Sequence, residues 1–270
     1  MSAVVGGLFR YPVKSCRGAS VPVACVEPWG LRGDRRWMVT DPGGAFATAR
    51  TLHRLLLVEP TPVADGLVLR APGAEPLHVA TPEGPRTDVV VWRDTVSATP
   101  AGPEADEWLS AVIGRPLRLV HLDDPTRRGV DPDYGRADDR VSFADGYPLL
   151  LTTEGSLEAL NALVAEGPNA AEAPLPMVRF RPNVVVTGTP AWAEDGWSSV
   201  RIGAARFRVV KPCGRCVMTT VDPDTAEKGR EPLATLAKHR RSGTNLLFGM
   251  NLIPDTPGVT IRVGDEVTPT

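Results

Sequence analysis

Glycine and proline interrupt this chain at short intervals, and this limits the secondary structure that it can form. The 270 residues include 26 Gly and 27 Pro, which is 26 + 27 = 53 residues in all. Proline removes a backbone donor and clashes inside a helix, and glycine is costly there, so few stretches are left for long helices. The pattern excludes a helical bundle and favours short strands with a few short helices.

Short apolar segments separated by turns fill most of the first 92 residues and predict a strand-rich module. The expected strands are residues 4–11, 20–26, 36–40, 55–58, 66–70 and 89–92. Asp41-Pro42-Gly43-Gly44 predicts a hairpin turn, because proline sets one φ and glycine allows a positive one. Further strands are expected at residues 183–188, 206–210 and 259–263.

Three segments have the apolar period of short helices. Residues 104–113 place apolar side chains on one face and are followed by Gly114. Residues 156–166 follow hydroxyl residues that can cap a helix, and residues 232–239 begin with proline. Residues 123–139 are charged and nearly without apolar side chains, which predicts a long loop, either an active-site lid or a disordered insert.

Charge and hydropathy exclude several classes of protein. The formal net charge, 30 − 32 = −2, argues against a nucleic-acid-binding protein. No apolar run approaches the roughly 18 residues of a membrane span, and the first residues lack the pattern of a secretory signal. We therefore expect no nucleic acid and no membrane as partners, and a cytoplasmic location. In that compartment, four cysteines are expected to be thiols or metal ligands.

Cys213-Gly214-Arg215-Cys216 is the strongest local motif. Two thiols at this spacing can bind a metal, form a redox disulfide or pack inertly at a hairpin. Zinc would need about two more ligands than the motif offers. A thioredoxin-like role needs a helix after the pair, whereas residues 217–221 have a strand pattern. Lys211 and Arg215 favour thiolate, whose softness suits a transition metal better than Mg or Ca.

Other clusters carry cations beside hydroxyl or amide groups. Lys14 and Ser15 follow the first expected strand, in a turn that could hold a phosphate. Arg35 opens a strand, and Arg181 and Asn183 precede another with donors that suit a planar heterocycle. Taken singly, each cluster is more often a solvated face or a partner in an ion pair.

In their order along the chain, these clusters resemble one family, the MOSC-domain proteins with an N-terminal MOSC β-barrel, which include the mitochondrial amidoxime-reducing component and its bacterial relatives. The matching motifs are Tyr11-Pro12-Val13-Lys14-Ser15, residues 33–39, 48–50, 91–94, 145–150, 156–161, 180–183, 213–225 and 248–251. The resemblance implies a mixed, β-rich (α+β) fold. It places an N-terminal MOSC β-barrel module at residues 1–95, a helical connector at 96–119 and a MOSC β-barrel domain at 120–270. Ala226 departs from the family, which commonly has glycine there.

The resemblance also implies a molybdenum cofactor, Mo-molybdopterin, in which a pterin dithiolene holds Mo and one protein cysteine is a further ligand. By its position in the motif this metal ligand and catalytic residue is Cys216, while Cys213 is implied to be structural. The positions that match the family's cofactor contacts are Lys14, Ser15 and Arg35 for the pterin and phosphate ends, and Thr152, Arg181, Asn183 and Arg215 for the remainder.

The implied activity is that of an oxidoreductase that reduces N-oxygenated compounds, such as amidoximes, N-hydroxylated bases or hydroxylamines. No cysteine follows Cys216, so we expect a separate flavin or iron–sulfur protein to donate the electrons. Two alternatives are a sulfur carrier or sulfurtransferase with a persulfide on Cys216, and a carrier of the molybdenum cofactor. The module that bears Lys14, Ser15 and Arg35 favours cofactor binding over a bare sulfur carrier.

Overall fold

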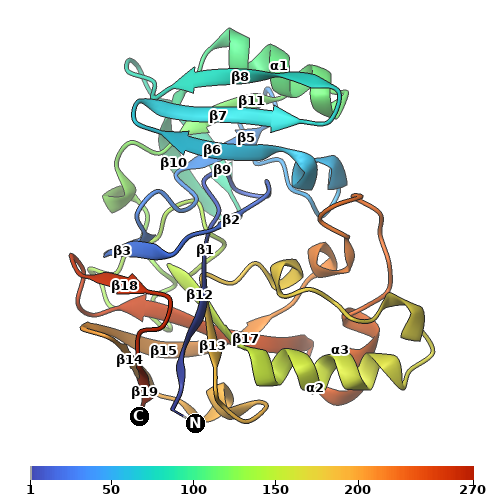
Figure 1. Ribbon diagram of the computed structural model, residues 1–270. Helices are drawn as coiled ribbons and strands as arrows, with labels where there is room; N and C mark the ends of the chain where they lie inside the picture. Colours follow the sequence, from blue (N-terminus) through green and yellow to red (C-terminus); the bar gives the residue numbers. More distant parts are fainter. Residues whose placement is uncertain (1) are drawn as a thin grey trace.

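The computed structural model describes residues 2–270, in which β-strands predominate (Figure 1). The helices are α1 (Pro103–Ile113), α2 (Glu154–Ala165) and α3 (Leu233–His239), with short 3₁₀ turns η1 (His53–Leu57), η2 (Pro125–Arg127), η3 (Ala170–Glu172), η4 (Met177–Phe180), η5 (Ala193–Gly196) and η6 (Val217–Thr220). The mixed, β-rich fold expected from the sequence is confirmed. None of the helices in this part of the chain is long and apolar enough to cross a membrane.

The largest sheet has nine strands and forms the lower part of the molecule in Figure 1. In spatial order they are β19 (Val267–Pro269), β14 (Ser199–Ile202), β15 (Ala205–Gly214), β17 (Asn245–Pro254), β12 (Leu149–Thr153), β13 (Val184–Thr187), β1 (Val4–Arg10) and β2 (Ala19–Ser20), with β16 (Arg241–Ser242) beside β17. Within it, only β12 and β13 pair in parallel, across α2.

Three smaller sheets complete the strand framework. One contains β5 (Trp37–Thr40), β11 (Arg118–His121), β10 (Asp94–Pro100) and β9 (Thr87–Val91); a second contains β18 (Thr260–Arg262), β3 (Val23–Glu27) and β4 (Gly30–Leu31); a third contains β6 (Glu59–Val63), β7 (Gly66–Ala71) and β8 (Ala74–Ala80). Strand pairing crosses the domain limits proposed from the sequence, because β1 pairs with β13 and β3 with β18. The limits 1–95, 96–119 and 120–270 stay a prediction.

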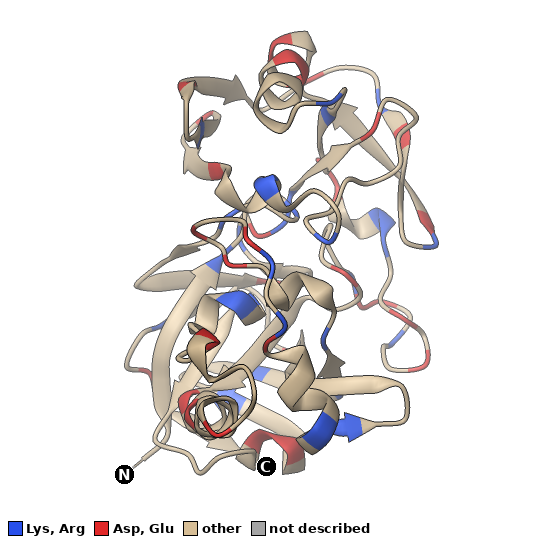
Figure 2. Cartoon of the chain, turned by 90° about the vertical axis from the view of Figure 1, so that its right-hand side faces the viewer, with Lys and Arg blue, Asp and Glu red and all other residues tan. Residues whose placement is uncertain are grey.

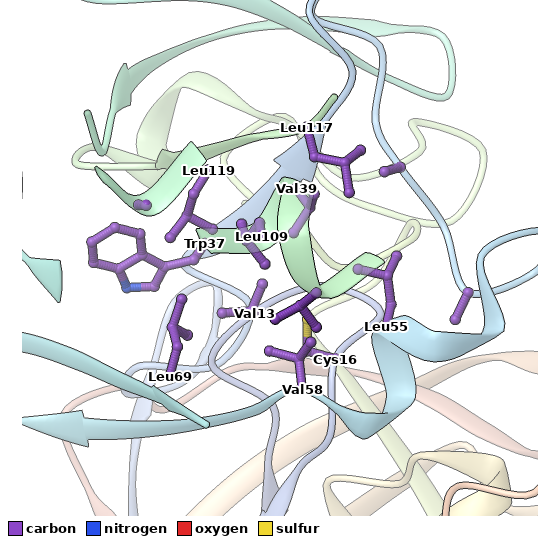
Figure 3. Close-up of a cluster of buried hydrophobic side chains, with 14 of the residues drawn as sticks. Val13, Cys16, Trp37, Val39, Leu55, Val58, Leu69, Leu109, Leu117 and Leu119 are labelled. Atoms are coloured by element: carbon purple, nitrogen blue, oxygen red, sulfur yellow. The ribbon is translucent and has the colours of Figure 1, made fainter. Parts of the chain in front are cut away.

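Separate apolar cores stabilise the two ends of the molecule. Figure 3 shows part of the upper core, in which Val13 and Cys16 meet side chains from β5, η1, β7, α1 and β11. The lower core lies on the large sheet and includes Leu8, Val184 and Phe207. Burying a large apolar side chain contributes roughly 1.5–3 kcal/mol, so each core can hold its own end of the molecule. The turn after β1 that carries Lys14 and Ser15 is therefore anchored in the upper core by Val13 and Cys16.

Local signals set the three helices. Helix α1 ends at Gly114, whose φ of 86° is left-handed and whose N–H donates to the Ser110 carbonyl. Helix α2 begins after Thr153, whose hydroxyl accepts from the N–H of Ser156. Pro232 precedes α3 directly. The helices expected at 104–113, 156–166 and 232–239 are therefore confirmed within two residues at each end.

Two expected strands are wrong. Residues 55–58 lie largely in η1, where Leu55 and Leu56 are both buried, so the short apolar run had no alternation to separate strand from helix. Residues 217–221 lie largely in η6, where the hydroxyls of Thr219 and Thr220 donate to carbonyls three residues earlier. The strand expected at 20–26 is split by Pro22 into β2 and β3.

The segment 123–139 is a loop, as expected, with only the short turn η2 within it. It is not a disordered insert, because Arg128 is 3% exposed and donates to the carbonyls of Ser142, Ala144 and Asp145. The same guanidinium pairs with Asp94 at 2.8 Å. The hydrogen bonds to the carbonyls of Ala144 and Asp145 tie the loop to a segment that lines the main pocket.

Candidate functional site

A pocket of about 140 Å³ lies where the upper and lower parts of the molecule meet. Figure 2 shows Lys and Arg positions gathered in this region. Its walls come from the turn after β1, the turn before β5, the segment before β12, the end of η4 and the end of β15. Residues that are far apart in the sequence therefore face one cavity.

The pocket brings together seven of the eight residues predicted from the sequence. They are Lys14, Ser15, Arg35, Arg181, Asn183, Arg215 and Cys216. Thr152 does not line the pocket: it is fully buried in β12, and its hydroxyl donates to the Met177 Sδ at 3.2 Å. A direct contact between Thr152 and a ligand stays a prediction.

The lining is strongly cationic although the whole chain is slightly acidic. Six lining residues carry a positive charge, namely Lys14, Arg35, Arg50, Arg179, Arg181 and Arg215. Asp145 is the carboxylate among the lining residues. Such a concentration of one charge in a cleft attracts an oppositely charged ligand. The pocket is therefore suited to an anion.

Lys14 and Asp145 form an ion pair between the two halves of the site. Lys14 is 5% exposed, and its Nζ also donates to the Phe143 carbonyl at 2.8 Å. Burial lowers the pKa of Lys14 to about 8. Partial loss of water would raise the pKa of Asp145, but the charge of Lys14 outweighs this effect and holds that pKa well below its ordinary value. Trp92 Nε1 and Arg50 Nη2 lie 3.2 and 3.4 Å from the same carboxylate.

Arg35 and Arg181 are held by a network of charge-assisted hydrogen bonds. Arg35 Nη1 donates to Asp34 at 2.6 Å and to Asn183 Oδ1 at 2.9 Å, and its Nη2 donates to the Arg181 carbonyl at 3.2 Å. Arg181 Nη1 donates to the Cys16 carbonyl at 2.7 Å. Burial, followed by the charge of Arg35, lowers the pKa of Arg181 to about 10. Asn183 therefore orients Arg35 as well as facing the pocket.

Three lining residues have left-handed backbone conformations. The φ angles are 69° at Ser15, 47° at Arg35 and 55° at Arg181. Residues with a Cβ pay roughly 1–2 kcal/mol each in this region. Such conformations cluster at functional sites, where the surrounding structure maintains them. Three such conformations around one cavity indicate that this part of the backbone belongs to a functional site.

Both cysteines of the motif line the pocket and are free thiols. Arg215 Nη1 lies 2.9 Å from Cys213 Sγ, and its Nη2 donates to the Phe180 carbonyl at 2.7 Å. Cys216 immediately precedes η6, so the expectation of a strand after the pair is wrong. Residues 2–270 contain no cluster of three or more His, Cys, Asp or Glu that could hold a metal by themselves.

Several donors at the pocket lack a protein partner within the described residues. They are Arg179 Nε, Arg181 Nη2 and Arg215 Nε, each buried. A buried donor left without a partner costs about 1–3 kcal/mol, so these atoms favour a ligand that offers several acceptors. Together with the free thiol of Cys216, they suit an anionic ligand that contains a soft metal centre.

Sequence reasoning missed further lining residues. Arg50, Asp145, Tyr147 and Asn251 belong to the motifs that carried the resemblance, but no role was assigned to them. Arg179 stands two residues before Arg181 and pairs with Asp222 at 3.0 Å. The density of arginine next to the predicted contacts was the available signal for Arg50 and Arg179.

Two family models match consecutive parts of the chain. The MOSC N-terminal beta barrel domain matches residues 2–116, and the MOSC domain matches residues 138–268. Mitochondrial amidoxime-reducing component 1 of Xenopus laevis is 34% identical over 98% of this chain and 81% of its own length, and its Homo sapiens counterpart is 34% identical over 97% and 82%. Molybdenum cofactor sulfurase of Homo sapiens is 30% identical over 98% of this chain but only 32% of its own length.

Proposed function

Because this chain belongs to the family of MOSC-domain proteins with an N-terminal MOSC β-barrel domain, we propose that it is a molybdenum-cofactor-dependent oxidoreductase that reduces N-oxygenated compounds. The relatives are named as amidoxime-reducing components and molybdenum cofactor sulfurases, and these names support a reductase function related to the molybdenum cofactor. The substrates would be small amidoximes, N-hydroxylated bases or hydroxylamines.

The observation that carries this proposal is the combination of a cationic cavity, unpartnered guanidinium donors and the Cys216 thiol in one lining. Mo-molybdopterin is a fitting ligand, because its phosphate and pterin acceptors match the donors and its metal matches a thiolate. In this assignment Cys216 is the metal ligand. The residues that would hold the remainder are Lys14, Ser15, Arg35, Arg181, Asn183 and Arg215.

When bound, the cofactor would supply a metal that takes the substrate oxygen and exchanges two electrons. The chain's own residues bind and orient. The guanidinium groups of Arg35 and Arg181 each offer paired N–H donors that suit oxyanions. Arg215 contacts both Cys213 Sγ and the Phe180 carbonyl, and these contacts hold the loop that carries Cys216 in place.

Reducing N–OH to N–H also takes up two protons and releases water. Lys14 Nζ, with a pKa of about 8, holds a proton at neutral pH, whereas the neighbouring Asp145 stays ionised. The proposal includes a separate flavin or iron–sulfur electron donor and a cytoplasmic location for the enzyme.

The decisive test is the molybdenum content of protein purified from a host that makes the cofactor, measured by inductively coupled plasma mass spectrometry. We expect near-stoichiometric Mo in the wild type, loss of Mo in Cys216→Ala and retention of most Mo in Cys213→Ala. The matched pair is informative because both thiols line the pocket but only Cys213 contacts Arg215.

Equal loss of Mo in both variants would contradict the assignment of Cys216. Absence of Mo in the wild type, together with a labile sulfur on Cys216, would instead favour the sulfur-transfer alternative suggested by the sulfurase relative. For Mo-loaded protein, consumption of an N-hydroxylated amidine with a chemically reduced viologen as donor would test the reaction itself.

A further inference from the structure

The ring of Tyr11 contacts two guanidinium groups of the candidate site. Arg35 Cζ is 4.4 Å and Arg181 Cζ is 4.2 Å from the ring centroid. Tyr11 is only 2% exposed, and it lines a smaller neighbouring cavity rather than the main pocket. Tyr11 therefore acts on the pocket only through the two arginines.

The position of the ring is closely defined. The Tyr11 N–H donates to Asp34 Oδ1 at 2.8 Å, and the Tyr11 carbonyl accepts from the N–H of Arg35 at 2.7 Å. Gly18 packs against the ring so closely that a Cβ at this position would lie 2.2 Å from ring atoms Cδ1 and Cε1. Any larger residue at position 18 would have to displace the ring.

The hydroxyl of Tyr11 has no part in these contacts. Its oxygen is buried and has no hydrogen-bond partner among residues 2–270. Burial raises the pKa of Tyr11 to about 12, so the ring is uncharged over the working range of the protein. The aromatic face, and not the phenol, is what the two arginines contact.

The two arginines differ in how firmly other groups hold them. Arg35 is anchored by three acceptors, whereas the guanidinium of Arg181 donates to the Cys16 carbonyl and has a buried Nη2 without a partner. The two like charges repel each other, and the aromatic ring that both contact attracts each of them. Arg181 is thus oriented largely by the ring.

We propose that Tyr11 is a positioning residue, whose aromatic ring sets the spacing of the Arg35 and Arg181 guanidinium groups so that both can meet one anionic ligand. The inference rests on the proposed function for the identity of that ligand, but the spacing would act on any oxyanion in the pocket. Cation–π contacts strengthen when they are removed from water, as they are here.

The test uses the full-length, metal-free protein and measures the affinity for inorganic phosphate by isothermal titration calorimetry. We expect Tyr11→Phe to bind within about twofold of the wild type, since it keeps the ring, and Tyr11→Leu to bind about tenfold more weakly, since two desolvated cation–π contacts are lost. Phe207→Leu, which removes a buried ring from the lower core, serves as a control for stability and should keep wild-type affinity.

Equal affinity of Tyr11→Leu and the wild type would overturn the inference, and so would equal weakening in Tyr11→Phe, which would assign the effect to the hydroxyl. If Tyr11→Leu does not fold, Gly18→Ala decides: weaker phosphate binding supports a role for the ring position, and unchanged binding rejects it. Failure of the wild type to bind phosphate at millimolar concentration would also reject it. The proposed function is tested separately by Mo content. If the phosphate affinities are as expected but the protein never acquires Mo, the proposed function fails and the role of Tyr11 stands.

Discussion

Replacing Lys14 by methionine should change how the stability of the metal-free protein depends on pH. The pKa of Lys14 is lowered from 10.5 to about 8 in the folded protein, chiefly by burial. The unfolded chain therefore binds more protons than the folded chain between these two values. Stability must then rise with pH through this window, because protonation favours the unfolded state there.

The magnitude follows from the two pKa values. One pKa unit corresponds to about 1.4 kcal/mol, so the full shift is worth roughly 3 kcal/mol. Between pH 7 and pH 9.5, the contribution of Lys14 to the free energy of unfolding should increase by about 2 kcal/mol. Cys16 has the opposite effect and lowers the stability as the pH rises above 9, because burial raises its pKa from 9.0 to about 12 in the folded protein. The difference between wild type and Lys14→Met cancels this common effect.

The assay is urea denaturation at half-unit steps from pH 6.5 to 9.5, for the wild type and Lys14→Met. The free energy of unfolding of the wild type minus that of the variant should increase by about 2 kcal/mol between pH 7 and pH 9.5. Lys238→Met, which removes an exposed lysine from α3, is the matched control and should differ from the wild type by a constant. A constant difference for Lys14→Met as well would refute a lowered pKa for this buried amine.

Two further substitutions test the loop and the backbone. Arg128→Met should lower the free energy of unfolding by about 3 kcal/mol, because it leaves buried carbonyls without a donor. Urea denaturation measures this loss. The control is Arg127→Met, which removes a half-buried neighbour with surface ion pairs and should lower the free energy of unfolding by less than about 1 kcal/mol. Ala226→Gly should raise the free energy of unfolding by about 0.5–1 kcal/mol, because φ is 60° at this residue, and a loss of stability would show that its Cβ makes contacts that outweigh the strain.

Much of the local structure could be predicted from the sequence because its causes lie within a few residues. Gly114 ends α1 through its left-handed conformation, and the Thr153 hydroxyl caps α2. The motif at 213–216 was found because its two thiols are close in the chain. The errors at 55–58 and 217–221 arose where a short apolar run suits either a strand or a 3₁₀ turn.

The candidate site was only partly accessible to this reasoning. The resemblance to the family indicated eight residues, of which seven line the pocket, whereas Thr152 is fully buried in β12. The sequence could not reveal that Asp145 neutralises Lys14, because 131 positions separate them. The role of Tyr11 was hidden for the same reason, since Arg181 reaches its ring from the other half of the protein.

The sequence by itself determined the β-rich class, the short helices, the thiol pair and the clusters of cationic and amide side chains beside the strands. These features depend on propensity, capping and composition, which act between near neighbours in the chain. The tertiary structure alone decided that β1 joins the large sheet, that six cations share one cavity, and that one tyrosine ring contacts two of them. These features depend on strand pairing and packing between segments more than a hundred residues apart, and such contacts leave no periodic mark on either segment.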